Sequence, residues 1–400
     1  MERERAEHTQ TNSDTDTDTD SAATRGDSAG AIFLAFLAFG ARAFGGPAAQ
    51  IGELSAEFVD ERRWVTRERF RSALAIYQLL PGPEAHEMCC YLGAARGGRL
   101  GSVAAGLGFM LPGLALMLVA CFAYASVDLA AAPVACAMAA MQLAASALIV
   151  RAAWRLTKPL FSSGPAMIAA MAVSCAIAMW WFAPAGDGAI AAASATATSA
   201  AATTSATTAP AMFGHGLTAG LVTFGGAYTA IPYVATVATG DHGWMTRGEL
   251  LDGVAIASVL PAPLVIFGTF VGFRGAGLAG ALAFTAGIFL PAFSFTLIGF
   301  GAIERLLAWK PARRALDLAS AIAIGLIVGA ALHIVLGALG GWPLTNLGAT
   351  RFGIATPIAF AALVALVFRV RSHFAVPVIV VGAGVLGAAF GAISSGALAK

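Results

Sequence analysis

The sequence predicts an all-α integral membrane protein made of two tandem, inverted repeats, with about 10–12 membrane segments, some of them broken or re-entrant. Of the 400 residues, 58% are hydrophobic and only 12% are charged, and the mean hydropathy is +0.78. These values lie outside the range of water-soluble globular proteins. The net charge of +2 shows no basic excess that would point to nucleic acid. Long apolar runs alternate with charged loops, and several short motifs occur twice at one spacing.

Apolar stretches long enough to cross or enter about 30 Å of hydrocarbon follow one another along the chain. Because backbone groups in lipid must be hydrogen-bonded internally, each stretch is expected to be helical. The expected segments are 29–46, 72–95, 101–126, 132–150, 164–184, 211–237, 250–272, 276–301, 317–338, 355–368 and 374–397.

Composition divides the chain into five parts. Residues 1–28 are hydrophilic and acidic, which predicts a disordered tail rather than a signal peptide. Residues 29–184 form the first expected repeat, and the Ala/Ser/Thr-rich tract at 185–210 is the expected linker. Residues 211–340 form the second repeat, and residues 341–400 are expected to form a C-terminal helical hairpin.

The two halves repeat each other in sequence. Three motifs recur 180 residues later: Phe44–Gly46 as Phe224–Gly226, Trp64–Arg67 as Trp244–Arg247, and Leu80–Pro83 as Leu260–Pro263. Chance does not hold three unlike motifs at one spacing, so the pattern indicates an internal duplication.

Positive charge falls on different loops in the two halves. In the first half it gathers at Arg62, Arg63, Arg67, Arg69, Arg71, Arg96 and Arg99, and again at Arg151, Arg155 and Lys158. In the second half it gathers at Arg305, Lys310, Arg313 and Arg314, where the first half carries only Asp128. By the positive-inside rule, equivalent loops face opposite sides, which predicts inverted repeats. One crossing is left over: either segment 164–184 does not span simply, or the Ala/Ser/Thr tract enters the membrane.

Paired prolines interrupt matching segments of the two halves. Pro81 and Pro83 lack backbone donors and clash with the preceding turn, and the same holds at Pro261 and Pro263. We therefore expect segments 72–95 and 250–272 to enter and leave on the same side. Paired interruptions of inverted repeats are the best pointer to a substrate site in transporters.

Five stretches carry a family resemblance: FGGPAAQI (44–51), EFVDERRWV (57–65), QLLPGPEA (78–85), FGGAYTAIPYV (224–234) and HGWMTRGELLDG (242–253). On these, residues 30–340 resemble the long, two-domain form of the chromate ion transporter family. The resemblance implies efflux of chromate from the cytoplasm of a bacterium or similar microbe. Gln50 stands where many relatives carry His, which weakens a proton-relay role there. Ala262 replaces the second Gly of the paired PGP motif, which implies a mainly structural second half or an altered affinity.

The residues themselves also suit an anion. Gly45 and Gly46 let the backbone turn sharply so that its N–H groups approach an oxyanion, and helix starts after FGG and PGP add partial positive charge. The alternative is that the glycines only permit close helix packing. The candidate substrate-binding residues are Arg42, Phe44, Gly45, Gly46, Gln50, Gln78, Pro81, Gly82, Pro83, Phe224, Gly225, Gly226, Tyr228, Pro261 and Pro263.

Arg42 is the sharpest single candidate, because an ionised residue in an apolar run costs at least about 2.5 kcal/mol and should face a cavity or a partner. The alternative is snorkelling to the membrane surface, since Arg42 lies near the end of its segment. Tyr228 is a candidate donor to the oxyanion or an interfacial aromatic residue.

Glu84 and His86 follow the first break and are candidates for proton coupling. The alternative for Glu84 is ordinary stabilisation of a helix N-terminus. The HExxC run at 86–90 lacks the second His of a zinc helix, so we expect no metal site. Flavin, haem and thiol motifs are missing from the sequence, so we expect no cofactor and no enzyme activity.

Membrane energetics favour export. Moving one charge through 100 mV is worth about 2.3 kcal/mol, so a dianion leaving an inside-negative cell gains about twice that. We expect alternating access in the inner (plasma) membrane, with an oxyanion and the bilayer as partners and no nucleic acid. A homodimer, proton antiport, a sulfate-type permease and an anion channel remain open, as does the choice among chromate, sulfate and related oxyanions.

Overall fold

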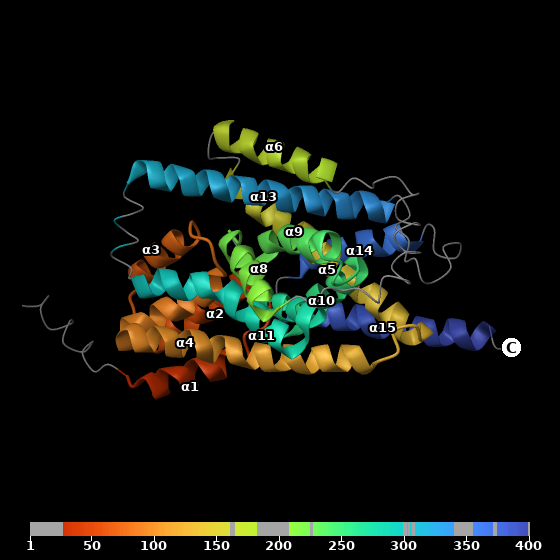
Figure 1. The fold of residues 1–400 in the computed structure, drawn as a ribbon, viewed down its shortest axis with the longest axis horizontal. Helices are drawn as coiled ribbons and strands as arrows, with labels where there is room; N and C mark the ends of the chain where they lie inside the picture. The colour runs from red at the N-terminus through yellow and green to blue at the C-terminus, as the bar shows by residue number, and fades with distance from the viewer. Residues whose placement is uncertain are drawn as a thin grey trace, which may run out of the picture.

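The computed structural model of the protein describes residues 27–160, 165–181, 208–224, 227–298, 309–339, 355–370 and 374–398, together with residues 302 and 305. The described residues form helices joined by short turns, and they contain no strand. The expected all-α class is therefore confirmed. Several long helices, among them α4 and α13, run along the longest axis of the molecule (Figure 1).

The first half contains α1 (Ala29–Gly40), α2 (Pro47–Leu54), the π-helix η2 (Ser55–Glu61), α3 (Arg67–Tyr77), α4 (Glu84–Ser126), α5 (Ala132–Leu160) and α6 (Pro165–Trp181). The second half contains α8 (Ala209–Leu221), the 3-10 helix η3 (Ala227–Thr229), α9 (Ala230–Ala235), the π-helix η4 (Thr236–Asp241), α10 (Arg247–Val259), the 3-10 helix η5 (Leu264–Ile266), α11 (Phe267–Ile298), α13 (Lys310–Leu339), α14 (Ala355–Arg369) and α15 (Ala375–Leu398).

Two of these helices, α4 and α11, are folded back on themselves. Each reverses direction at a glycine in the left-handed region, Gly98 (φ 60°) in α4 and Gly277 (φ 61°) in α11. The glycine backbones on either side of each reversal touch, so Gly93 lies against Gly101 and Gly272 against Gly280. We call residues 84–96 and 99–126 the short and long arms of α4, and residues 267–275 and 278–298 the short and long arms of α11.

The first helix of each half packs beside the long arm that follows it. In the first half, Gly40 of α1 lies against the backbone of Phe109 in the long arm of α4. In the second half, Gly216 of α8 lies against the backbone of Phe284 in the long arm of α11. The same elements therefore make the same contacts in both halves, which confirms the expected duplication.

The proline-interrupted segments are re-entrant, as the sequence predicts. The guanidinium carbon of Arg96, at the end of the short arm of α4, lies 6.0 Å from the ring centre of Trp64, just before α3. In the second half, Arg274 at the end of the short arm of α11 binds Glu249 in the first turn of α10 at 2.5 Å. Each segment therefore enters the molecule, breaks at its prolines and returns to the end from which it started.

The two repeats are antiparallel. Gly106, near the start of the long arm of α4, lies against Phe293 near the end of α11. Phe122, near the end of α4, stacks edge-on against Phe273, just before the reversal of α11, with ring centres 5.1 Å apart. The reversal at Gly98 and the reversal at Gly277 therefore lie at opposite ends of the molecule, which confirms the inverted arrangement.

Helices near the end of each half cross over to the other half. α15 packs along α5, with Gly387 against Cys136 and Gly391 against Ala132. α6 packs along α13, with Gly325 against Met171. α14 also joins the apolar cluster that α5 and α15 form. The C-terminal helices α14 and α15 therefore pack against the helices of the first half.

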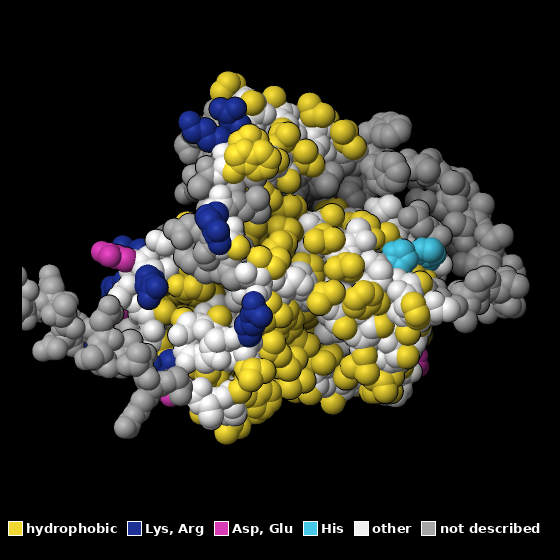
Figure 2. Space-filling model, turned by 60° about the vertical axis from the view of Figure 1, so that its left-hand side comes forward, with side chains coloured by type: hydrophobic (Ala, Val, Ile, Leu, Met, Phe, Trp, Pro, Cys, Tyr) yellow, Lys and Arg dark blue, Asp and Glu magenta, His cyan; other side chains and the backbone are white. Residues whose placement is uncertain are grey.

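The surface carries the signature of a membrane protein. Four described helices are long and apolar enough to cross a membrane, namely Glu84–Ser126, Ala132–Arg155, Leu264–Ile298 and Ala375–Ser395, and shorter apolar helices accompany them. A broad apolar surface lies between one end rich in Lys and Arg and an opposite end that carries His side chains (Figure 2). This distribution fits the expected multi-pass protein.

Element boundaries differ from the expected segments in several places, most clearly in the second half after α8 and at the end of α5. The expected segment 211–237 is not one helix, since α8 ends at Leu221 and a short 3-10 turn, α9 and η4 follow the FGG turn. α5 continues to Leu160, ten residues past the expected end of its segment at 150. The acidic tail and the linker lie almost wholly outside the described residues; Asp27 is described and binds Arg96 at 2.9 Å.

Candidate functional site

The first break is a buried turn between α3 and the short arm of α4. Pro81, Gly82 and Pro83 are all buried, and Gly82 has φ +152°, a conformation that favours glycine. A Cβ on Gly82 would lie 2.6 Å from a carboxylate oxygen of Glu87. The Gly82 N–H donates to the carbonyl of Thr223, directly before the FGG motif of the second repeat, at 2.7 Å. The first break is therefore held by the opposite repeat.

The second break lies at the equivalent place in the second repeat, but its residues differ chemically from those of the first break. Pro261, Ala262 and Pro263 are buried, and the Ala262 side chain packs against Gly113 of the long arm of α4. The Ala262 carbonyl accepts a hydrogen bond from Nε2 of Gln50 at 3.0 Å. The two breaks thus meet the FGG regions of opposite repeats, as a pseudo-two-fold axis between the repeats requires.

Gln50 is fully enclosed at this crossing point. Its Nε2 donates both to the Ala262 carbonyl and to the Ala43 carbonyl, each at 3.0 Å, and Oε1 has no partner among the described residues. Ala43 is the counterpart of Thr223, and Ala262 is the counterpart of Gly82. Thr223 and Gly82 bind each other directly at the first break, whereas Gln50 bridges Ala43 and Ala262 at the second. The side chain ties the FGG turn of one repeat to the break of the other.

The first FGG turn follows the end of α1. Arg42 is 59% exposed and pairs with Glu57 of η2 at 2.5 Å. Phe44 is half-buried and lies against Phe374 with ring centres 5.7 Å apart. Gly45 has φ +97°, which a residue with a Cβ would adopt only under strain, and Gly46 forms the N-cap of α2 without a side-chain cap. The backbone therefore turns sharply here and starts a new helix.

The second FGG turn is partly described. Gly225 and Gly226 lie outside the described residues. The Phe224 N–H donates to the hydroxyl of Thr229 at 2.9 Å, which closes the turn before α9. Tyr228 is half-buried and interacts electrostatically with Arg151 and Arg155 of α5.

The titratable residues expected beside the first break are in place and buried. Glu84 is 8% exposed and His86 is fully buried. The His86 ring packs against Phe289 and Phe293 of α11, with centres 4.8 and 4.7 Å away. Gln78 is exposed at the end of α3. His86 thus lies at the interface between the repeats.

Glu87 is a residue that the sequence interpretation did not assign. It is fully buried, and neither carboxylate oxygen has a hydrogen-bond partner among the described residues. Charged, partnerless carboxylates are very costly inside proteins, so a buried one in a membrane segment marks a functional position. The sequence signal for this position is that Glu87 follows Gly82 of the proline break by five residues.

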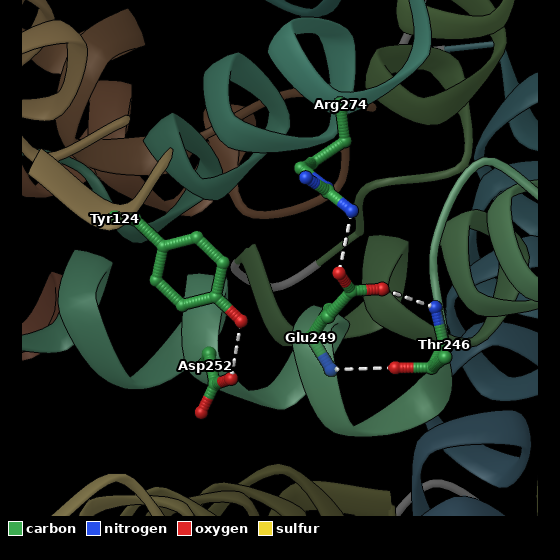
Figure 3. A network of polar contacts seen from close by, with 5 residues as sticks. All are labelled: Tyr124, Thr246, Glu249, Asp252 and Arg274. Carbon is green, nitrogen blue, oxygen red and sulfur yellow. Dashed lines mark hydrogen bonds and ion pairs between the residues drawn. The ribbon is translucent and has the colours of Figure 1, made fainter. Parts of the chain in front are cut away.

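Polar contacts join α10 of the second repeat to α11 and to the long arm of α4 (Figure 3). Thr246 and Glu249 form a capping box at the start of α10, and Glu249 also binds Arg274. Tyr124 donates to Asp252 at 2.7 Å, so the long arm of α4 is tied to α10 of the other repeat. Asp252 is therefore a structural link between the repeats.

In the described part of the chain, no group of three or more His, Cys, Asp or Glu side chains is placed so that it could hold a metal ion. The structure instead brings together backbone turns and helix starts from both repeats, Gln50, and the Glu84 to Glu87 cluster. Two antiparallel repeats with interrupted segments meeting between them define a polytopic membrane transporter with inverted repeats.

Comparison with known proteins agrees with this class. The family model described as chromate transporter matches residues 30–201 and 210–388. The chain belongs to the chromate transporter family.

Three relatives cover most or much of the chain. A chromate transport protein of Pseudomonas aeruginosa is 38% identical over 387 residues, which are 89% of this chain and 91% of the relative. A chromate transport protein of Cupriavidus metallidurans is 27% identical over 88% of this chain and 90% of its own length. A probable chromate transport protein of Synechococcus elongatus is 26% identical over 66% of this chain and 73% of its own length. No solved structure matches the chain.

Proposed function

We propose that this protein exports chromate, or a related tetrahedral oxyanion, from the cytoplasm across the plasma membrane and so confers chromate resistance. The observation that carries the proposal is the meeting of the two breaks with opposite repeats, through Gly82 and Thr223 and through Gln50 and Ala262. Rocking of one repeat against the other would change these contacts and open the site alternately to the two sides. The chromate transport proteins related to this chain support the choice of substrate.

Binding would rest on the turns and helix starts of the first repeat. The Gly45 turn and the helix start at Gly46 present backbone N–H groups, and the short arm of α4 starts at the buried break. Arg42 would attract the anion at the mouth of the site, where Glu57 holds its guanidinium in position. Tyr228 would donate its hydroxyl from the second repeat.

The arrangement of charge supports export as the direction of transport. Arg62, Arg67, Arg96 and Arg99 lie at the end of the molecule that contains the Gly98 reversal, and the positive-inside rule places that end in the cytoplasm. A dianion that leaves an inside-negative cell gains about 4–5 kcal/mol per 100 mV, so the membrane potential alone drives export. Coupling to protons would add to this force, with Glu84 and His86 as the exchanging groups.

The direct test is radiolabelled chromate uptake by everted membrane vesicles, whose outer face is the cytoplasmic face. We expect saturable uptake that an interior-positive potential accelerates and that excess sulfate reduces. Imposed proton gradients of both signs test the coupling. Uptake no faster than in vesicles without the protein would refute the proposal, and uptake that never saturates would indicate a channel.

A further inference from the structure

Among the described residues named so far for the proposed site, none brings a free cation to the breaks. The residues after the first break are acidic, namely Glu84 and Glu87. Arg42 is paired with Glu57 and is mostly exposed. Two carboxyl groups beside a dianion are unfavourable unless positive charge is also present. A dianion at the breaks therefore needs positive charge from another element.

α5 brings arginine side chains to the depth of the breaks. Its Gln142 donates to Asp252 at 2.8 Å and to the Gly248 carbonyl, so this part of α5 lies beside the first turns of α10. Further along, Val150 of α5 and Val259 of α10 pack against the same apolar cluster. Since α10 ends at Val259, directly before the second break, Arg151 lies level with that break.

Arg151 and Arg155 interact with groups from both repeats. Both guanidinium groups interact electrostatically with Tyr228, which follows the FGG turn of the second repeat. Arg155 also interacts with Glu84, the first residue after the first break. The Nη1 of Arg151 makes a long hydrogen bond of 3.5 Å to the Val370 carbonyl, which holds its side chain against the end of α14.

These two arginines occupy an unusual position for ionised residues. Arg151 is half-buried and Arg155 is exposed, one helical turn further along the same face of α5. An arginine at this depth of a membrane segment faces a partner or a water-filled cavity rather than lipid, because ionised side chains in hydrocarbon are costly. The titratable groups on which Arg151 and Arg155 act, Tyr228 and Glu84, follow the second FGG turn and the first break.

We propose that Arg151 and Arg155 of α5 bind the transported oxyanion, as the cationic side of a site whose other sides are the two breaks and Tyr228. The inference rests on the proposed function. A guanidinium presents a planar fork of N–H donors that matches two oxygens of a tetrahedral oxyanion. Arg155 already acts electrostatically on Glu84, and an arriving dianion would compete for its charge.

The second repeat does not duplicate this feature. Beyond Arg314, α13, which corresponds to α5, carries no lysine or arginine. A cationic pair that served only to place a loop in the cytoplasm would have no reason to lie beside Tyr228 and Glu84. The pair marks one side of the molecule as the binding side.

The test is chromate uptake by everted vesicles with Arg151→Gln, Arg155→Gln and Arg155→Lys, each normalised to its abundance in the membrane. Arg99→Gln is the matched control, since Arg99 is an exposed arginine of α4 remote from the breaks. We expect each glutamine variant to lower the initial rate at subsaturating chromate by at least about tenfold, which equals about 1.4 kcal/mol. Arg155→Lys should raise KM and leave the maximal rate within about twofold, because charge remains but the fork is lost.

Unchanged rates in both glutamine variants, with active unaltered protein, would overturn this inference and leave the proposed function standing. Equal losses in Arg99→Gln would also overturn it, because the effect would then be one of general surface charge. If Arg151→Gln fails to accumulate, the exposed Arg155 decides the question. Inactivity of the unaltered protein would refute the proposed function and this inference with it.

Discussion

The two breaks occupy equivalent places in antiparallel repeats, yet their chemistry is different. The first contains Gly82 at a positive φ, and the residues behind it are Glu84, His86 and Glu87. The second contains Ala262, and the residues at the matching places are Leu264, Ile266 and Phe267, all buried and apolar. The first break thus holds the titratable groups, whereas the second supplies shape and packing.

The same asymmetry extends to the turns and to the flanking helices. Arg42 of the first repeat corresponds to Val222 of the second, and the arginines of α5 have no charged counterpart in the apolar part of α13. Duplication therefore provides the antiparallel scaffold that alternating access needs. One copy carries the titratable groups beside its break, while the other keeps the backbone interruption and carries Tyr228.

The largest expected effect comes from removing the charge that only the first repeat carries at its FGG turn. Arg42→Ala should abolish chromate resistance while membrane abundance stays unchanged, because an exposed side chain contributes little to folding. Growth on chromate and immunoblots of membranes measure the two quantities. Val222→Ala is the matched control and should retain resistance; full resistance of Arg42→Ala would remove Arg42 from the mechanism.

Exchanging the central residues of the breaks should have the next largest effect. Gly82→Ala forces a Cβ onto a positive φ at a cost of about 1–3 kcal/mol, and the new methyl group meets the Glu87 carboxylate. We expect chromate uptake to fall about tenfold or more, with a lower unfolding temperature in detergent. Ala262→Gly should cost only about 0.5–1 kcal/mol. Equal effects of the two changes would contradict the asymmetry.

Proton coupling should depend on the first break alone. For transport coupled to one proton, a pH difference of one unit changes the steady-state accumulation of chromate by about tenfold. Glu84→Gln and His86→Asn should abolish this dependence and leave uptake driven by the membrane potential. Vesicles with imposed pH gradients measure it, and Glu68→Gln, at an exposed position of α3, is the control. A retained dependence in both variants would place coupling elsewhere or exclude it.

A smaller effect is expected where the repeats are tied together. Gln50→Leu removes the donor of two buried carbonyls, Ala43 and Ala262, and should destabilise the protein by about 1–3 kcal/mol. Gln50→His retains a donor and should recover part of the loss. Thermal unfolding in detergent gives the stabilities. A stability of Gln50→Leu equal to that of the unaltered protein would show that the bridge does not hold the repeats together.

Much of the fold could be predicted from the sequence, because its causes are local. Proline pairs break helices wherever they occur, and the recurrence of three motifs identifies the duplication. Loop charges then gave the inverted orientation. The gaps between the expected segments 72–95 and 101–126, and between 250–272 and 276–301, also fall at or beside the observed reversals. The positive φ of Gly98 and Gly277 was not predicted, since each reversal contains several residues that could have made the turn.

The site could be predicted only in part, because its contacts join distant residues. Gln50 and Ala262 are 212 positions apart, and no local pattern specifies their hydrogen bond. Arg151 and Arg155 were counted as a loop flank because the apolar run ends at residue 150, whereas α5 continues through them. Glu87 received no role from the sequence, since burial without a partner becomes visible only in three dimensions.

The measurement that tests the antiparallel scaffold most directly is labelling of single cysteines beside the two reversals. Arg99→Cys and Leu278→Cys place a thiol at exposed positions next to Gly98 and Gly277, and the described native cysteines are mostly buried, so the unaltered protein provides the background. With a membrane-impermeant maleimide, we predict labelling of Leu278→Cys in intact cells and of Arg99→Cys only in everted vesicles. Labelling of both positions from the same side would contradict the inverted repeats and, with them, the proposed site between the breaks.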